Sequence, residues 1–178
     1  MICSNAMPTP SLAVLGLGSN LGNSRHIILD AAKALEEVLT ELRRASLYET
    51  EPLYVTDQGR FINTALAGYF DGSAGELLKR VNEIEGRFGR DRARERRWGE
   101  RPLDIDILLF GNQMINDNDL EIPHPRLKER RFALEPLLEL LPGALEPGTG
   151  LSYKAICDAL PPQGVKRADC LGGYCRKK

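Results

Sequence analysis

Histidine, cysteine and aromatic residues are all scarce in this chain of 178 residues, which has two histidines, four cysteines and 6% Phe, Trp and Tyr. Three of the cysteines lie near the C-terminus, but Cys170 and Cys175 have four residues between them and no histidine nearby. This spacing is unlike that of zinc ligands. We therefore expect free thiols in a reducing cytosol and a cytoplasmic protein.

Long apolar runs and an excess of charge of one sign are also missing. No segment approaches the ~20 apolar residues of a membrane span, so no membrane association is expected. The N-terminal residues lack the basic and apolar regions of a secretory signal. The formal net charge of −1 argues against a general nucleic-acid binder.

The length favours one domain with a core of its own, and we find no internal repeat or linker. We expect a disordered or non-native tail over 1–11, one domain over 12–160 and a C-terminal tail over 161–178.

Hydrophobic periodicity predicts alternating strands and helices. The order is βαββαβ, which is typical of an α+β, ferredoxin-like sandwich with an antiparallel sheet. Two further short helices are expected at 131–142 and 153–161. The expected strands cover 12–18, 42–50, 61–70 and 103–110, and the expected helices of the sandwich cover 24–39 and 73–88.

Two aspartates interrupt the apolar strand LDIDILLF. Side chains two apart in a strand share a face, so Asp104 and Asp106 should converge while Leu103, Ile105 and Ile107 face the core. Paired carboxylates suit Mg²⁺, which completes its shell with water and phosphate oxygens. The alternative is a solvated face on which the aspartates pair with arginines.

The preceding loop is strongly basic. Residues 87–101 contain seven arginines against three acidic residues. The planar guanidinium matches phosphate oxygens well, so the loop is suited to a polyphosphate. A solvated basic loop, or one that grips RNA backbone, remains the alternative.

Two other groups point to a ligand. His124 lies between two prolines and is followed by the basic residues Arg126, Lys128, Arg130 and Arg131, which favours phosphate contact over a structural role. Phe61 and Phe132 could flank a flat ring whose hydrogen-bonding edge Asn63 reads, although two core phenylalanines are the alternative.

Four motifs together resemble the 6-hydroxymethyl-7,8-dihydropterin pyrophosphokinase family of folate biosynthesis. They are GLGSNLGN, YETEPLYVTDQGRFIN, the arginine-rich RRWGERPLDIDILLFG and IPHPR followed by RRF. The resemblance implies a ferredoxin-like fold and transfer of pyrophosphate from ATP, the co-substrate, to the pterin hydroxymethyl group, with release of AMP. It also implies two Mg²⁺ ions.

The resemblance assigns roles to individual residues. Asp104 and Asp106 would hold the metals, and Arg90 and Arg101 would be catalytic. The nucleotide side would comprise Glu85, Arg97, Trp98, Ile107, His124 and Arg130. The pterin would lie between Phe61 and Phe132, with its edge read by Thr50, Asn63 and the main chain at Leu53.

Two alternatives from other classes remain at this point. One is an RNA-binding module, which shares the element order but needs aromatic runs on its central strands that we do not find. The other is a two-metal nucleotidyltransferase. For the kinase, the expected partners are the small molecules pterin and ATP, without nucleic acid or membrane, and association with neighbouring folate-pathway enzymes.

Overall fold

One antiparallel sheet organises the chain. The computed structural model describes residues 9–51, 59–90 and 101–168. The six-stranded sheet has the order β5-β1-β4-β3-β8, and β2 pairs with the other half of β4. Its strands are β1 (Ser11–Ser19), β2 (Thr40–Arg44), β3 (Tyr48–Thr50), β4 (Phe61–Phe70), β5 (Asp104–Phe110) and β8 (Lys166–Arg167).

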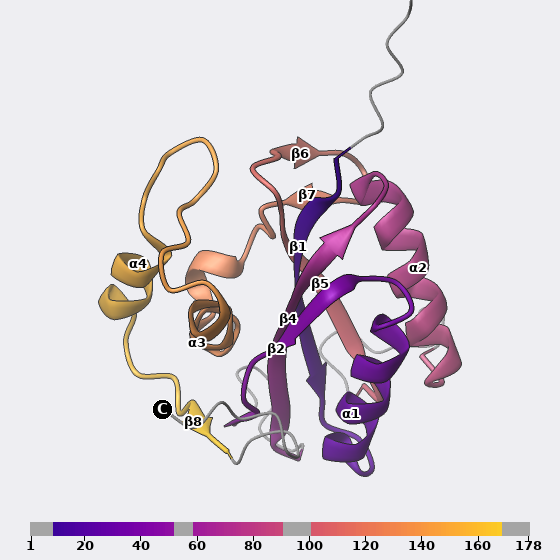
Figure 1. Ribbon diagram of the computed structural model, residues 1–178. Coiled ribbons are helices and arrows are strands. Elements are labelled where there is room, and N and C mark those ends of the chain that lie inside the picture. Colours follow the sequence, from indigo (N-terminus) through magenta and orange to yellow (C-terminus); the bar gives the residue numbers. More distant parts are fainter. Residues whose placement is uncertain (1–8, 52–58, 91–100, 169–178) are drawn as a thin grey trace, which may run out of the picture.

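Helices cover both faces of this sheet. Helices α1 (Ser24–Leu35) and α2 (Ala74–Arg87) lie on one face, and α3 (Arg131–Leu140) and α4 (Tyr153–Ala159) lie on the other (Figure 1). Two short strands, β6 (Ile115–Asn116) and β7 (Glu121–Ile122), and a 3₁₀ turn (Leu127–Glu129) connect β5 to α3. The predicted ferredoxin-like sandwich and both extra helices are confirmed.

The sequence of β1 explains why there are two cores. Leu15 and Leu17 belong to the core beneath α1 and α2, whereas Val14 belongs to the core beneath α3 and α4, as strand alternation requires. Gly16 and Gly18 follow Val14 on the α3 face. Both glycines are partly buried: side-chain atoms of Leu108 lie 3.3 Å from where a Cβ of Gly16 would be, and Asn63 Oδ1 lies 3.0 Å from that position at Gly18.

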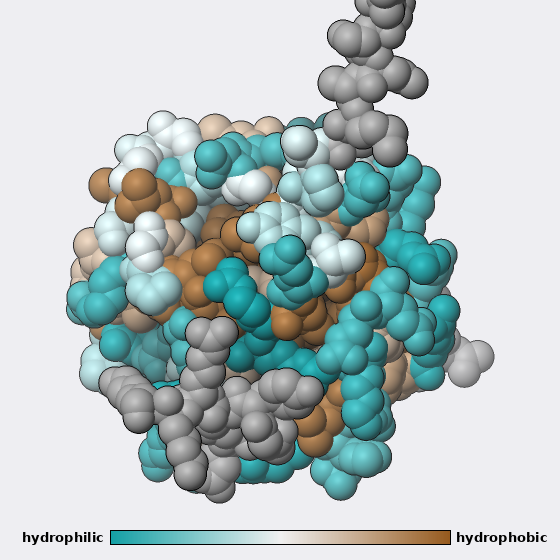
Figure 2. All heavy atoms as spheres, in the orientation of Figure 1, coloured by the Kyte–Doolittle hydropathy of each residue, from teal (hydrophilic) through white to brown (hydrophobic). Residues whose placement is uncertain are grey.

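Polar caps and polar outer surfaces complete the helix layer. Asn23 Oδ1 accepts from His26 N at 3.3 Å, and Ser73 and Glu76 form a reciprocal capping box at the start of α2. The outward surface of α1 and α2 is predominantly hydrophilic (Figure 2). Beneath them, Phe70 packs edge-on against Phe110 with ring centroids 6.4 Å apart. None of the helices in the described ranges is long and apolar enough to cross a membrane.

Three boundaries differ from expectation. The strand expected over 42–50 is two strands, β2 and β3, which pair with different halves of β4. The register of β2 shifts between Thr40 and Arg43, where Glu41 has a φ of 52°, and such a bulge bends a strand. Helix α1 ends at Leu35 rather than at 39, and the sheet continues past residue 160 because β8 pairs with β3.

Candidate active site

The two aspartates lie partly exposed on the α3 face. Asp104 pairs with Gly18 and Asp106 with Gly16, and on the other side of β1, Gly18 pairs with Asn63. Paired residues of antiparallel strands share a face, so Asn63, Gly18 and Asp104 form one row across three strands. The predicted convergence of the aspartates is confirmed, with Ile105 buried on the opposite face.

Two arginines hold Asp104. Arg101 Nη1 lies 2.8 Å from Asp104 Oδ2, and Arg90 Nη1 contacts the other carboxylate oxygen. Arg90 is itself buried against Glu85, whose side chain also accepts from Ile105 N at 2.7 Å. The charges therefore form a connected network from α2 through Arg90 to the start of β5.

Asn20 fixes the main chain of Arg101, a role that our sequence analysis missed. Its Oδ1 accepts from Arg101 N at 2.8 Å, and Asn20 N donates to Arg101 O at 3.3 Å. The pair joins the end of β1 to the residues just before β5. The available signal was the polar Ser-Asn pair directly after an apolar strand.

Asp106 faces a second pair of side chains. Arg130 Nη1 lies 3.4 Å and His124 Nε2 lies 3.6 Å from Asp106 Oδ2. Desolvation, and next the negative charge of Asp104, raise the pKa of Asp106 to about 7. A cation bound beside both carboxylates would offset their mutual repulsion.

His124 is neutral at physiological pH. Desolvation, together with the positive charge of Arg130, lowers the pKa of His124 to about 4. Its Nδ1 accepts from Arg126 N at 3.1 Å, so in the neutral ring the proton is on Nε2, the nitrogen that faces Asp106. The ring thus presents a hydrogen-bond donor to the site.

The aspartate pair fits a magnesium site in chemical terms. Within the described ranges, no three His, Cys, Asp or Glu side chains gather as a metal-binding group. Mg²⁺ does not need such a cage, because it takes one or two carboxylates and fills its other positions with water and substrate phosphates. The side chains of Asp104 and Asp106 are 27% and 36% exposed, so such ligands can reach them.

Residues expected at the pterin lie along the same face. Asn63 and Thr50 are buried, and Asn63 Nδ2 donates to Thr50 Oγ1 at 2.8 Å. Phe61 is the cross-strand partner of Thr50. Phe132 lies in the first turn of α3, and the Arg130 guanidinium carbon is 5.7 Å from the centre of its ring. Phe61 and Phe132 thus belong to the two layers that meet at this face.

Not every expected residue joins the cluster. The Ile107 side chain is 4% exposed and packs in the core beneath α1 and α2, so only its main chain is left for a contact with adenine. Leu53, Arg97 and Trp98 lie outside the described residues. Glu85 is placed as a buried partner of Arg90.

The raised pKa of Asp106 leads to a pH prediction. The folded protein retains a proton on Asp106 up to about pH 7, whereas an unfolded aspartate loses it near its usual pKa of 3.8. Between these values the folded state binds more protons, so this group makes stability fall as pH rises.

We therefore expect metal-free Asp106→Asn to gain stability relative to wild type between pH 5 and pH 8, as measured by urea unfolding. A constant difference across this range would contradict the assignment. Asp158→Asn, which removes an exposed carboxylate of α4, is the matched control.

Comparison with known proteins matches this chain to one family of pyrophosphokinases. Residues 14–142 match the sequence profile of 7,8-dihydro-6-hydroxymethylpterin-pyrophosphokinase, HPPK. The chain is 39% identical over 158 residues to the Aquifex aeolicus 2-amino-4-hydroxy-6-hydroxymethyldihydropteridine pyrophosphokinase, covering 88% of this chain and 95% of that protein. The Bacillus subtilis protein of the same name is 39% identical over 132 residues, covering 73% of this chain and 78% of that protein.

Longer relatives carry the same region. An Arabidopsis thaliana mitochondrial folate synthesis bifunctional protein is 40% identical over 162 residues, which are 90% of this chain but 28% of the relative. The chain therefore spans about a quarter of that protein. The fold also matches a solved Plasmodium falciparum HPPK-DHPS structure with a TM-score of 0.66 and 16% identity, over 84% of this chain and 44% of that one. The sequence match over most of the chain establishes that this protein belongs to the HPPK family.

Proposed function

We propose that the protein transfers the pyrophosphoryl group of ATP to the hydroxymethyl oxygen of 6-hydroxymethyl-7,8-dihydropterin and releases AMP. The observation that carries the proposal is the row Asn63, Gly18 and Asp104 across neighbouring strands. A polar group suited to reading a ring edge and a carboxylate suited to Mg²⁺ thus share one face of the sheet. Family membership favours this reaction over RNA binding or nucleotidyl transfer.

The reaction forms a bond between the pterin oxygen and the β-phosphorus and breaks the bond from that phosphorus to the oxygen bridging to the α-phosphate. The hydroxyl proton passes to solvent, and AMP leaves. Two Mg²⁺ ions at Asp104 and Asp106 would neutralise phosphate charge and favour ionisation of the attacking hydroxyl. The protein's own task is to orient both substrates and to stabilise charge.

Four side chains would serve the phosphates. Arg90 and Arg101, which pair with Asp104 in this structure, would donate to phosphate oxygens once a cation takes over the carboxylate. Arg130 and the Nε2–H group of His124 would donate to the phosphates or ribose from the Asp106 side. Their location at one end of the row leaves the Asn63 end for the pterin.

The pterin slot can be tested by substitution of Phe132. Stacking contributes roughly 1 kcal/mol per ring face, so Phe132→Leu should weaken pterin binding by about fivefold. Leucine keeps most of the apolar volume in the α3 core, so we expect ATP binding to change little. Titration calorimetry with each ligand measures both effects.

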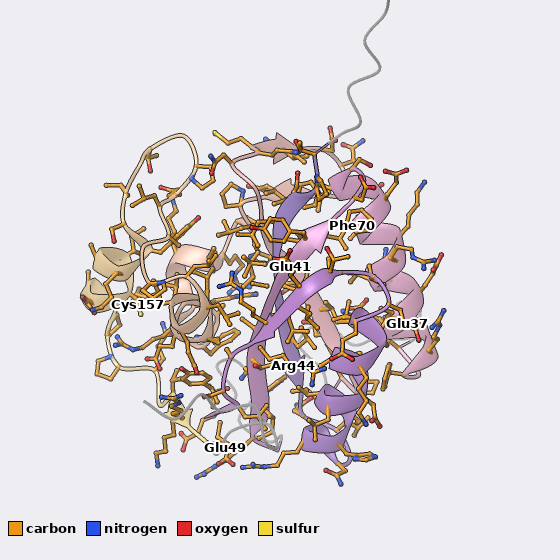
Figure 3. The ribbon with its side chains drawn as sticks, viewed as in Figure 1. Glu37, Glu41, Arg44, Glu49, Phe70 and Cys157 are labelled. Atoms are coloured by element: carbon orange, nitrogen blue, oxygen red, sulfur yellow. The ribbon has the colours of Figure 1, made fainter. Side chains whose placement is uncertain are left out.

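Phe70→Leu is the matched control, because Phe70 (labelled in Figure 3) belongs to the core beneath α1 and α2, on the other side of the sheet. It should lower the melting temperature without a selective effect on pterin. Equal loss of pterin and ATP affinity in Phe132→Leu would instead favour a purely structural phenylalanine.

The defining experiment measures AMP formation from ATP, Mg²⁺ and the hydroxymethyl-dihydropterin. We expect AMP and the pterin diphosphate in equal amounts, and release of inorganic pyrophosphate would contradict the reaction. We also propose a cytoplasmic location. Separately, we propose association with another folate-pathway enzyme, supported by relatives that are named as bifunctional folate synthesis proteins.

A further inference from the structure

The N-terminus of α3 receives its cap from a distant residue. Arg130, in the N-cap position, makes no side-chain hydrogen bond to the helix. Instead Gln163 Oε1 accepts from Arg131 N at 2.8 Å, and Gln163 Nε2 donates to Glu129 O at 2.8 Å. One carboxamide therefore bridges the two residues that flank Arg130.

The cap is reciprocal. Helix termini leave unpaired N–H and C=O groups. Here Gln163, just after α4, pairs with an N–H group at the start of α3, and Arg131 of α3 pairs with C=O groups at the end of α4. The Arg131 side chain donates to Cys157 O at 3.1 Å and to Leu160 O at 2.9 Å at the C-terminal end of α4. Glu135 Oε1, 2.7 Å from Arg131 Nε, orients the same guanidinium.

The chain beyond Gln163 is attached to the sheet through β3, the strand that contains Thr50. In β8, Arg167 pairs with Tyr48 and Lys166 with Glu49 of β3 (Glu49 is labelled beside β8 in Figure 3). The Arg167 guanidinium also lies 2.9 Å from Glu139 Oε1 of α3 and 2.7 Å from Ser46 Oγ. Residues 160–168 thus run from α4 past α3 to the strand that ends at Thr50 (Figure 1).

Arg130 and Phe132, the residues on either side of Arg131, both belong to the candidate site. Arg130 lies between the two residues that Gln163 holds, and its guanidinium contacts Asp106 and the Phe132 ring. A shift of the first turn of α3 would therefore displace a phosphate-side cation and a pterin-side ring together.

We propose that Gln163 is a positioning residue, which fixes Arg130 and Phe132 by capping α3 from the C-terminal segment. The inference rests on the proposed function and adds to it a residue beyond the family-matched region 14–142. Gln163 suits this role because it offers one acceptor and one donor, as Arg131 N–H and Glu129 C=O require.

The test compares Gln163→Ala with Ser73→Ala. Each variant loses the N-cap of one helix, worth about 1 kcal/mol, and both should lower the melting temperature by a few degrees. Only Gln163→Ala should raise the KM for ATP and for pterin, by about fivefold each, with a smaller change in kcat. Ser73 caps α2 together with Glu76, and its side-chain hydrogen bonds in the described part of the chain involve no proposed site residue.

Two further measurements keep the result decisive. Gln163→Glu retains the acceptor for Arg131 N–H but loses the donor to Glu129 O, so its KM values should lie between those of wild type and Gln163→Ala. Hydrogen exchange reports the cap without substrate and should quicken at the first turn of α3 in Gln163→Ala.

The outcomes separate the two proposals. Wild-type KM values in Gln163→Ala, or unchanged exchange at α3, would overturn the positioning role while AMP formation still supported the kinase. Wild-type protein without AMP formation would overturn the kinase assignment alone, because the exchange measurement does not depend on it.

Discussion

Asp106→Ala is expected to lower turnover by roughly 10³-fold or more, the scale of losing a major charge-stabilising group in a transition state. The Asp106 side chain is 36% exposed and lies opposite Gly16 on the α3 face, outside the apolar core. Its removal leaves no apolar cavity and relieves its repulsion with Asp104. We therefore expect a folded protein whose melting temperature at neutral pH equals or exceeds that of wild type.

Asp104→Ala should lower turnover as much as Asp106→Ala does, but unlike that variant it should also lower the stability of the fold. Asp104 neutralises both Arg90 and Arg101, and Arg90 is almost fully buried. Removing one member of a buried charge network leaves the others undercompensated. The two aspartate variants should thus share a kinetic defect and separate in thermal denaturation.

Asp158→Ala is the control for charge, because it removes an exposed carboxylate on α4 that, among the described residues, forms an ion pair with Lys154 in the same helix. Steady-state kinetics at saturating Mg²⁺ and calorimetry of Mg-ATP binding measure the effect. Near-native turnover of either Asp104→Ala or Asp106→Ala would rule out the metal assignment.

Strand alternation was the most informative sequence signal. It placed Asp104 and Asp106 on one face and Ile105 and Ile107 on the other, and the structure confirms this arrangement. For Ile107 the two signals disagreed. The family resemblance implied a contact with adenine, whereas strand alternation predicted a side chain in the core. Its side chain is in the core, because a β-branched apolar residue at that register has a buried face available.

Long-range partners could not be predicted in the same way. The segment 42–50 looks like one strand locally, and its division depends on which half of β4 each part pairs with. Strand β8 has two charged, exposed residues and no apolar pattern. Its place in the sheet depends on contacts with β3 and Glu139, which local sequence does not reveal. For this reason residues 161–178 were expected to form a C-terminal tail.

The two proposed catalytic arginines should respond differently to truncation. In Arg90→Ala the buried carboxylate of Glu85 loses its ion partner, and breaking a buried pair typically costs about 3–5 kcal/mol. Arg101 is about one quarter exposed, and its partner Asp104 is also partly exposed, at 27%. Arg90→Ala should therefore lose both stability and activity, whereas Arg101→Ala should remain close to wild type in stability.

Arg101→Ala is consequently the cleaner kinetic test. Asn20 holds the main chain of residue 101 through contacts that alanine preserves, so the loss is confined to the guanidinium. If that group stabilises charge that moves during pyrophosphoryl transfer, kcat should fall by about 10³-fold while ATP affinity changes much less. Arg101→Lys restores charge but not the planar fork and should recover only part of the rate. Single-turnover kinetics and calorimetry separate the two effects, and a variant that loses ATP affinity at unchanged kcat would show that Arg101 only binds the nucleotide.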